Sequence, residues 1–359
     1  MDLPEKLKTA IENLTQDTDR AKLANSSRDI SERYRSNTGT GEKMLKGESE
    51  APAYAAARMP ATYGAIFSSL KYALDAMESA ITSPVTLLDV GAGTGAVSWA
   101  AEDLLSPVKI TCVENEEAML STGKRLMTEN PDLSVKTDWI KIDAATSALP
   151  CSADIVIASY FLNEIAVGGQ ARVLQKLWDA TRTLLLIVEP GTPAGYRQMM
   201  EHRRILIESG AEIIAPCPHG RECPLKADDW CAFKCRIPRS RLHRQLKDGD
   251  APYEDEKFIY LAALRPGKPL QHSAAVVPNH SAAQPPDTVA ATPDEADYHA
   301  MYGNSPVARI IRHPRVDKGR ITLELCSAEG LKKVTITKKD GELYKAARKA
   351  ETGDTIELP

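Results

Sequence analysis

The chain has 359 residues, a net charge of -4 from 45 basic and 49 acidic residues, and 43% hydrophobic residues. These values exclude a disordered or fibrous chain and predict a globular protein of about two structural units. No apolar run reaches the ~20 residues of a membrane helix, and the N-terminus is too polar for a secretory signal. We therefore expect a cytoplasmic protein without a membrane partner.

Residues 1–80 are predicted to be helical. Apolar residues recur there at intervals of three and four, which gathers them on one face of each helix. The residues that define this pattern are Leu3, Leu7, Ile11, Leu14, Leu23, Ile30, Tyr34, Ile66, Leu70, Leu74 and Met77.

From residue 86 onward, apolar strand-like runs alternate with helical patterns. The runs are VTLLDVG, VKITCVE, DWIKID, ADIVIASY and TLLLIVEPG, and FIYLAALR at 258–265 supplies a final strand. This alternation predicts an α/β fold in which helices cover both faces of a largely parallel sheet.

The remaining segments differ in composition from this alternating pattern. We expect an N-terminal helical region at 1–80 and an α/β domain at 81–265 that carries a cysteine-bearing insert at 215–250. Residues 266–304 are rich in Pro, Ala and His without apolar periodicity, so they are predicted to be a linker. Short β-rich runs then predict a small appendage at 305–359.

A glycine-rich turn follows the first predicted strand. Asp89 precedes Gly91, Gly93 and Gly95, and glycines at this point let the backbone approach a ligand closely. The spacing differs from the G-x-G-x-x-G of dinucleotide-binding proteins. It suits S-adenosylmethionine, whose amino acid portion an acidic residue such as Asp89 can bind, and this predicts a Rossmann-like class I methyltransferase sheet.

Two further acidic residues support this cofactor. Glu114 ends the second strand, where a carboxylate can accept both ribose hydroxyls, and Asp143 ends the third, where it can accept from the adenine amino group. A nucleotide fold that binds another ligand, or one that has lost its ligand, is the alternative.

The candidate catalytic residues follow the fourth strand, where such folds bring the methyl acceptor to the cofactor. Tyr160, Asn163 and Glu164 could shape or polarise an acceptor. Helix capping explains Asn163 equally well. The chain has neither an Asn-Pro-Pro-Tyr motif nor a Pro-Cys nucleophile, so turnover is left open.

Four of the seven cysteines lie within the insert. Cys217, Cys223, Cys231 and Cys235 have the spacing C-x5-C-x7-C-x3-C. Four thiols this close in sequence can ligate zinc or an iron-sulfur cluster, and the wide spacings with Cys-Pro pairs favour [4Fe-4S] over zinc. Cys326, in an apolar strand context, is expected to be a core residue.

Basic residues follow the third cysteine of the insert. They are Lys234, Arg236, Arg239, Arg241, Arg244 and Lys247. The appendage adds a second basic group, namely Arg309, Arg312, His313, Arg315, Lys318, Arg320, Lys332, Lys333, Lys338 and Lys339. Two such groups on an acidic protein favour RNA binding, while a solvated basic surface is the alternative.

With these motifs the sequence resembles the mitochondrial ribosomal small-subunit protein twenty-two family, also called methyltransferase-like protein seventeen, together with its bacterial relatives. The resemblance spans nearly the whole chain and rests on residues 31–35, 58–63, 216–235, 242–247 and 253–258. The cysteine block is its most specific part.

The resemblance implies a small-ribosomal-subunit partner, with its rRNA, and a [4Fe-4S] cluster on the four cysteines. No DNA partner is expected. We therefore predict a methyltransferase-like protein that methylates rRNA, assists subunit assembly, or both. The alternatives are a non-catalytic iron-sulfur assembly factor and a small-molecule methyltransferase with a structural metal site.

Overall fold

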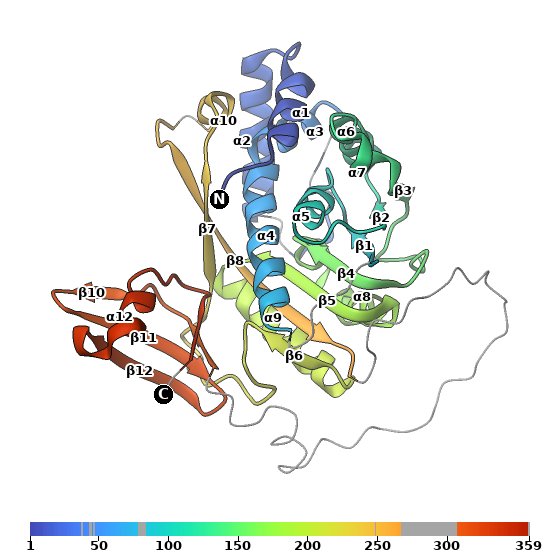
Figure 1. The fold of residues 1–359 in the computed structure, drawn as a ribbon. Coiled ribbons are helices and arrows are strands. Elements are labelled where there is room, and N and C mark those ends of the chain that lie inside the picture. The colour runs from blue at the N-terminus through green and yellow to red at the C-terminus, as the bar shows by residue number, and fades with distance from the viewer. Residues whose placement is uncertain are drawn as a thin grey trace, which may run out of the picture.

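The computed structural model describes residues 1–36, 39–42, 45, 47–77, 84–247, 249–266 and 307–357. They form an α/β unit and a smaller β-rich body at its side (Figure 1). Apart from Pro266, the predicted linker at 266–304 lies outside the described residues.

The chain begins with α1 (Glu5–Thr15), α2 (Arg20–Ser36), α3 (Glu50–Ala57) and α4 (Met59–Asp75), in agreement with the predicted N-terminal helices. The first half of the sheet region comprises β1 (Thr86–Val90), α5 (Ala96–Leu105), β2 (Lys109–Glu114), α6 (Glu117–Met127), α7 (Pro131–Val135), β3 (Thr137–Lys141) and β4 (Ala153–Ser159). The second half comprises η1 (Leu162–Glu164), α8 (Val167–Ala180), β5 (Thr181–Pro190), α9 (Pro193–Glu208), β6 (Glu212–Ala215), β7 (Phe233–Pro238), α10 (Arg241–Leu246) and β8 (Tyr253–Leu264).

The main sheet has the strand order β3-β2-β1-β4-β5-β8-β6, and β7 pairs with β8. β1 to β5 pair with one another in parallel, whereas β8 is antiparallel to β5, β6 and β7. This order, reversing at β1 and β4 and ending on an antiparallel strand, is the Rossmann-like class I methyltransferase fold that the sequence predicts.

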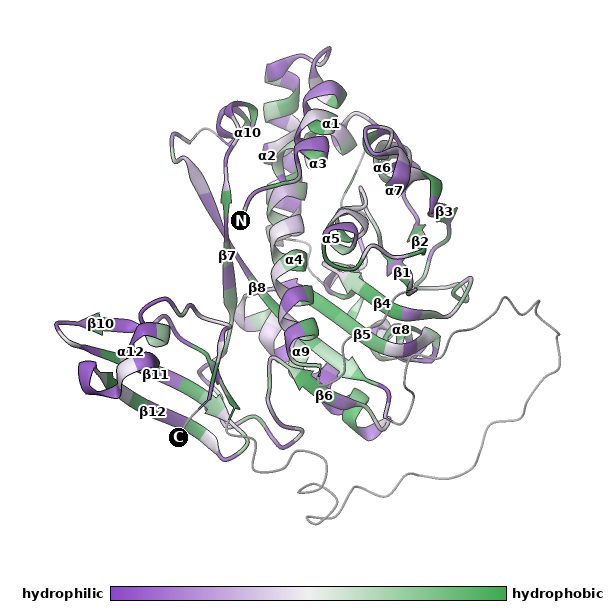
Figure 2. Ribbon diagram, viewed as in Figure 1, coloured by the Kyte–Doolittle hydropathy of each residue, from purple (hydrophilic) through white to green (hydrophobic). Residues whose placement is uncertain are grey.

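Successive residues of the central strands point to opposite faces of the sheet. Leu87 packs with the α1, α3, α4 and α5 side, whereas Leu88 packs with the α8 and α9 side. Both faces are therefore apolar, and the central strands appear as hydrophobic arrows in Figure 2. This burial on both sides explains why the strands are continuous apolar runs in the sequence.

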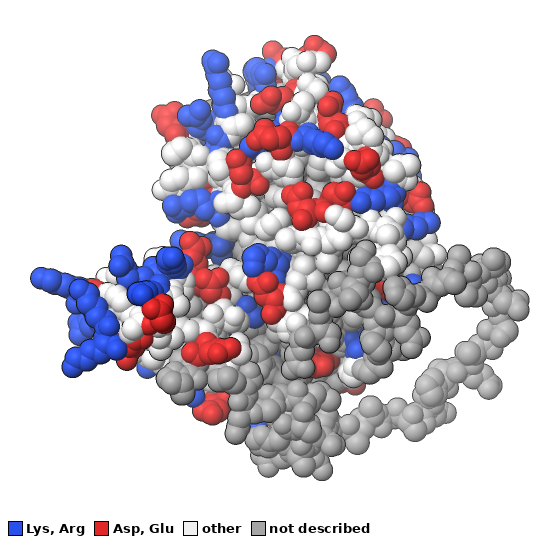
Figure 3. Space-filling model, in the orientation of Figure 1, with Lys and Arg blue, Asp and Glu red and all other residues white. Residues whose placement is uncertain are grey.

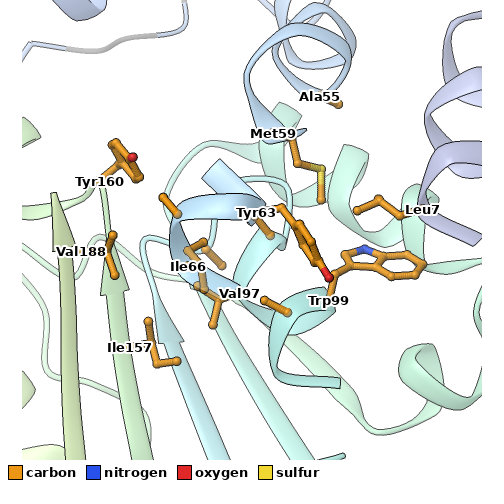
Figure 4. Packing of buried hydrophobic residues seen from close by; sticks show 14 of the residues in the cluster. Leu7, Ala55, Met59, Tyr63, Ile66, Val97, Trp99, Ile157, Tyr160 and Val188 are labelled. Atoms are coloured by element: carbon orange, nitrogen blue, oxygen red, sulfur yellow. The ribbon is translucent and has the colours of Figure 1, made fainter. Parts of the chain in front are cut away.

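One large core lies between the sheet and the N-terminal helices. Tyr63 of α4 and Trp99 of α5 are 1% exposed and lie next to Leu7 and Met59 (Figure 4). The Tyr63 hydroxyl donates to Asp103 Oδ2 at 2.6 Å, which satisfies its polar end. Because truncating such an aromatic side chain to alanine costs about 3–5 kcal/mol, α4 is a principal stabilising element.

Two strands of the main sheet, β6 just before the cysteine-bearing insert and β7 within it, were not predicted from the sequence. β6 pairs with the C-terminal half of β8, and β7 pairs with its N-terminal half. Alternate residues of β7 are buried, but the run FKCRIP mixes cationic and apolar residues in a way that hides this period. β6 was not predicted because it has 4 residues, which is too short for a strand to show a clear apolar pattern.

The appendage is an antiparallel sheet of order β10-β11-β9-β13, with β12 paired to β11. Its elements are β9 (Val307–Ile310), β10 (Arg315–Asp317), β11 (Arg320–Ser327), β12 (Gly330–Thr337), η2 (Lys338–Asp340), α12 (Gly341–Ala347) and β13 (Thr355–Glu357). Its own small core is apolar on the side that faces α12. The β-rich prediction for this part of the chain is confirmed.

Arg309 fastens the appendage to the α/β unit. Its side chain is buried, its Nε donates to Pro216 O at 3.1 Å, and its Nη1 donates to Gly353 O at 2.7 Å. The guanidinium also lies 5.7 Å from the ring centre of Tyr72 on α4. Arg309 was counted among the basic residues of the appendage, and these contacts give it a structural role instead.

Candidate cofactor site and cysteine cluster

The glycine-rich turn has the left-handed backbone that its composition predicts. Gly91, Gly93 and Gly95 have φ values of 73°, 56° and 87°. A Cβ on Gly91 would lie 2.5 Å from Cδ2 of Phe161, so a larger residue there meets both backbone strain and a steric clash. The turn leads directly into α5, whose N-cap residue is Gly95.

Glu114 organises this turn. Its Oε2 accepts from the backbone N–H of Gly93 at 2.7 Å, and its Oε1 accepts from Asn115 N and Glu116 N, both at 2.8 Å. Burial raises the pKa of this carboxyl, and the three backbone donors oppose that rise. The carboxylate at the end of β2 is thus held rigidly beside the glycine turn.

A cavity of about 510 Å³ lies at the carboxyl ends of β1, β2, β3 and β4. Gly91, Gly93, Glu114 and Asp143 all line it. The Asp143 carboxylate accepts from Ala145 N and Thr146 Oγ1, both at 2.9 Å, so it caps the turn that follows β3. Four of the six residues assigned to the cofactor from sequence therefore meet in one cavity.

Asp89 is buried elsewhere. It is not among the residues that line this cavity, and both of its carboxylate oxygens are buried without a hydrogen-bond partner among the described residues. Burial, reinforced by the nearby Glu114 charge, raises its pKa well above the usual range. Asp89 is therefore buried beneath the cavity's lining residues, and the carboxylate that accepts from the glycine turn is that of Glu114.

The three candidate catalytic residues face two different cavities. Glu164 lines the cavity of about 510 Å³ at the strand ends, which we call the cofactor cavity. Asn163 lines a second cavity of about 800 Å³, and Tyr160 lines both cavities. Tyr160 has a positive φ of 53°, and its hydroxyl donates to Glu256 Oε1 at 2.9 Å. A non-glycine residue in this conformation is strained, so the turn after β4 is held by its surroundings.

Glu189 at the end of β5 supplies part of that support, and the sequence analysis missed it. Its Oε1 accepts from Leu162 N at 3.0 Å and from Asn163 N at 3.4 Å, while Oε2 is buried without a partner among the described residues. Burial raises the pKa values of Glu189 and Glu164 to about 8. The only sequence signal was an acidic residue closing an apolar run.

These raised pKa values predict how stability depends on pH. The pKa of glutamate is near 4.5 in the unfolded chain and about 8 for the buried Glu189 carboxyl, so the folded state binds this proton more tightly. The resulting contribution to the free energy of unfolding is fully present below pH 4.5. That contribution is lost as the pH rises to about 8. We expect Glu189→Gln, which keeps the acceptor for Leu162, to flatten this part of the stability profile. Its melting temperature should exceed that of the wild type at pH 8.5 by a few degrees, and not at pH 5.

Thermal denaturation at five or six pH values measures this effect. Glu12→Gln is the control, because Glu12 is exposed on α1. Parallel profiles for wild type and Glu189→Gln would show that Glu189 is ionised in the folded protein.

Three of the four predicted cysteine ligands lie near one another. Cys217, Cys223 and Cys231 are close enough that their charges would interact. Cys326 of β11 joins them: it packs against Cys231, and its Sγ is 3.5 Å from Nε2 of His219. Burial raises the pKa of the Cys326 thiol to about 12.

Cys235 lies apart from this group. It is on β7 and faces α4, where its Sγ would be 3.0 Å from a Cβ on Gly64. Within the described residues, no set of three or more His, Cys, Asp or Glu side chains is arranged as a metal site. The thiols Cys217, Cys223, Cys231 and Cys326 are the donors that the fold gathers, but they are not held in a ligating geometry.

The basic residues of the insert are partly neutralised by β8. Arg236 forms two hydrogen bonds to Asp255, at 2.6 and 2.8 Å, and both Arg239 and Lys247 pair with Glu254. The three others, Lys234, Arg241 and Arg244, are exposed and make no ion pair within the described part of the chain.

The end of the appendage formed by the β10–β11 turn and the end of β12, which we call its free end, is more strongly basic than the insert (Figure 3). The backbone N–H of Lys338 donates to Gly319 O at 3.2 Å, which brings the β10–β11 turn and the end of β12 together. The exposed cations gathered there are Arg315, Lys318, Arg320, Lys338 and Lys339. Two acidic residues lie near these cations. Asp317 pairs with Arg315 and Arg320, and Asp340 accepts hydrogen bonds from the N–H and hydroxyl groups of Thr337.

The strand order and the glycine-Glu114 cavity place this chain in the class I methyltransferase-like proteins. Over residues 48–357 it matches the family described as mitochondrial small ribosomal subunit Rsm22. The protein belongs to this family, which confirms the resemblance drawn from its motifs.

Curated relatives agree with this assignment. The human mitochondrial ribosome assembly protein METTL17 is 30% identical over 196 residues, covering 50% of this chain and 42% of the relative. The mitochondrial Rsm22-cox11 tandem protein 2 of Schizosaccharomyces pombe is 24% identical over 338 residues, covering 85% of this chain and 43% of the relative. The chain thus spans less than half the length of these relatives.

Similar solved structures include magnesium protoporphyrin IX methyltransferase from Synechocystis with bound S-adenosylmethionine. It is 13% identical, covers 66% of this chain and 90% of its own, and has a TM-score of 0.39. A putative RNA methyltransferase from Pyrococcus horikoshii is 15% identical, with coverages of 67% and 96% and a TM-score of 0.37. Likenesses this distant identify no substrate.

The comparisons contradict the predicted cytoplasmic location. The family and the human and yeast relatives all carry a mitochondrial designation. The prediction rested on a polar N-terminus and the lack of a long apolar run, and neither feature distinguishes these compartments. Within the described residues, no helix combines the length and apolarity needed to cross a membrane.

Proposed function

We propose that this protein is an S-adenosylmethionine-binding, methyltransferase-like factor that acts on the small ribosomal subunit and contacts its rRNA. The observation that carries the proposal is the single cavity shared by the glycine turn, Glu114 and Asp143. Family membership supports the ribosomal partner, since the family is named for that subunit.

The residues of the cavity fit this cofactor. Gly91 and Gly93 line the cavity without side chains, and Glu114 and Asp143 add two carboxylates to it. We assign Glu114 to the ribose hydroxyls and Asp143 to the adenine amino group. When bound, the cofactor supplies an electrophilic methyl group. Positioning is what this chain contributes, because methyl transfer depends on the alignment of the two reactants.

Transfer of labelled methyl from S-adenosylmethionine to small ribosomal subunits from cells lacking this protein tests the proposal. Label in rRNA with the wild type and its loss with Glu114→Gln would establish the enzyme. The conservative change keeps the size of the side chain while removing its charge. Absence of both cofactor binding and subunit binding by the folded wild type would refute the proposal.

A non-catalytic assembly factor is the second candidate. The human relative is named a ribosome assembly protein, and the turn after β4 has neither an Asn-Pro-Pro-Tyr motif nor a Pro-Cys nucleophile. Firm subunit binding with no transferred label, unchanged by Glu114→Gln, would favour this candidate.

We further propose that the free end of the appendage binds rRNA phosphates. The three cations Lys318, Lys338 and Lys339 are exposed and form no ion pair within the described residues. Reversing all three to Glu should weaken binding to small subunits at least tenfold near 0.15 M salt. The slope of log affinity against log salt should become shallower by about 2–3, because each lost phosphate contact removes about one counterion.

Filter binding across a salt series measures both effects. The control reverses Lys22, Lys124 and Arg125, which are exposed on α2 and α6 and give the same change in net charge. Equal weakening by the two triple variants would mean that overall charge, and not this surface, governs binding.

A metal centre at the cysteines is the last part of the proposal. Cys217, Cys223 and Cys231 supply three thiols, and Cys326 is better placed than Cys235 to supply the fourth. Four thiolates suit [4Fe-4S], with zinc as the alternative. Such a centre would join the insert to the appendage, since Cys326 lies on β11.

A further inference from the structure

A second cavity, of about 800 Å³, adjoins the cofactor cavity. It lies between α2, the turn after β4, the start of α9 and the end of α10. Tyr34 and Tyr160 line both cavities and so form the wall between them. A ligand in the second cavity would therefore lie directly beside one in the first.

The polar groups of this cavity include a buried acceptor, unpaired within the described part of the chain, and several positive groups. Asn163 is 2% exposed, and its Oδ1 is buried with no hydrogen-bond partner among the described residues. Since an unpaired buried carbonyl is costly, it marks a position where a ligand N–H would be stabilised.

Cationic side chains outnumber acidic ones among the lining residues, with Arg28, Arg58 and Lys247 against Glu32. Lys247 is also paired with Glu254. The N-terminus of α9 also opens onto the cavity through Thr192 and Gly195, so the helix dipole adds partial positive charge. An anionic group is favoured on this side.

We infer that this second cavity binds a nucleotide whose base donates an amino N–H to Asn163 and whose phosphate lies toward Lys247 and the start of α9. The inference rests on the proposed function and names its substrate class: a single nucleotide of RNA that carries an exocyclic amine. Uridine, which has no amino group, is the poorer ligand.

Binding of free 5′-monophosphates of cytidine, adenosine, guanosine and uridine tests the inference. Calorimetry or ligand-observed NMR would be run on the full chain in the presence of S-adenosylhomocysteine. We expect at least one of the amino-bearing nucleotides to bind more tightly than uridine monophosphate. Asn163→Ala should abolish that preference and weaken binding about tenfold, the usual effect of losing one buried hydrogen bond.

Two further variants keep the result interpretable. Lys247→Gln should weaken binding of all four nucleotides alike, because it removes charge and no base contact. Gln175→Ala is the control, since Gln175 is exposed on α8 and its side chain donates to Asp179 Oδ1. If Asn163→Ala fails to fold, Asn163→Asp replaces it, and the added negative charge should also weaken binding.

The inference would be overturned if no nucleotide binds the folded protein, or if inorganic phosphate alone binds as tightly as the nucleotides. Equal affinity for all four nucleotides that Asn163→Ala leaves unchanged would also overturn it. Cofactor binding and subunit binding are measured on the same preparation. If these persist while nucleotide binding fails, only the inference falls and the proposed function stands.

Discussion

Replacing Gly91 with alanine should weaken cofactor binding more than tenfold. Gly91 has a φ of 73°, where any other residue is strained by about 1–2 kcal/mol. A Cβ there would also lie 2.5 Å from Cδ2 of Phe161, so that ring or the turn must move. Either movement displaces a group that lines the cofactor cavity, since Phe161 and Gly91 both line it.

Titration with S-adenosylhomocysteine by calorimetry measures the affinity, and thermal unfolding measures the accompanying loss of stability. Gly168→Ala is the matched control, because Gly168 lies on α8 with nothing within 4 Å of the added Cβ and no positive φ. We expect that control to bind as the wild type does. Undiminished binding by Gly91→Ala would place the cofactor elsewhere.

Replacing Cys231 or Cys326 with serine should remove most of the bound metal. These two thiols pack together, and burial raises the pKa of both, so ligation is what would stabilise their thiolate forms. Cys235→Ser should retain the metal, because Cys235 faces α4. Cys151→Ser serves as a further control, since Cys151 is exposed.

Iron, sulfide and zinc contents of anaerobically purified protein measure this result. Iron with an equal amount of sulfide would identify a cluster, whereas zinc alone would identify the alternative. If Cys235→Ser loses the metal and Cys326→Ser keeps it, then Cys235 is the fourth ligand, as the sequence predicts, and Cys326 is not. Metal-free wild-type protein would exclude the centre altogether.

The sequence by itself determined β1 to β5 and β8 of the main sheet and the edge at which the cofactor cavity lies. The strands are apolar on both faces, so they appear as uninterrupted runs, and the residues after each run meet at one edge of any parallel sheet. Gly91, Glu114 and Asp143 could be assigned in this way because their positions follow from local pattern and spacing.

Only the tertiary structure decided which long-range neighbours these residues have. Cys326 joins Cys231 because the appendage docks on the insert, and the 94 intervening residues give no sign of that contact. Likewise, Arg236 is neutralised because the register of β7 on β8 sets it opposite Asp255. Such pairings depend on strand register and on the docking of separate bodies, and neither leaves a periodic signal in the chain.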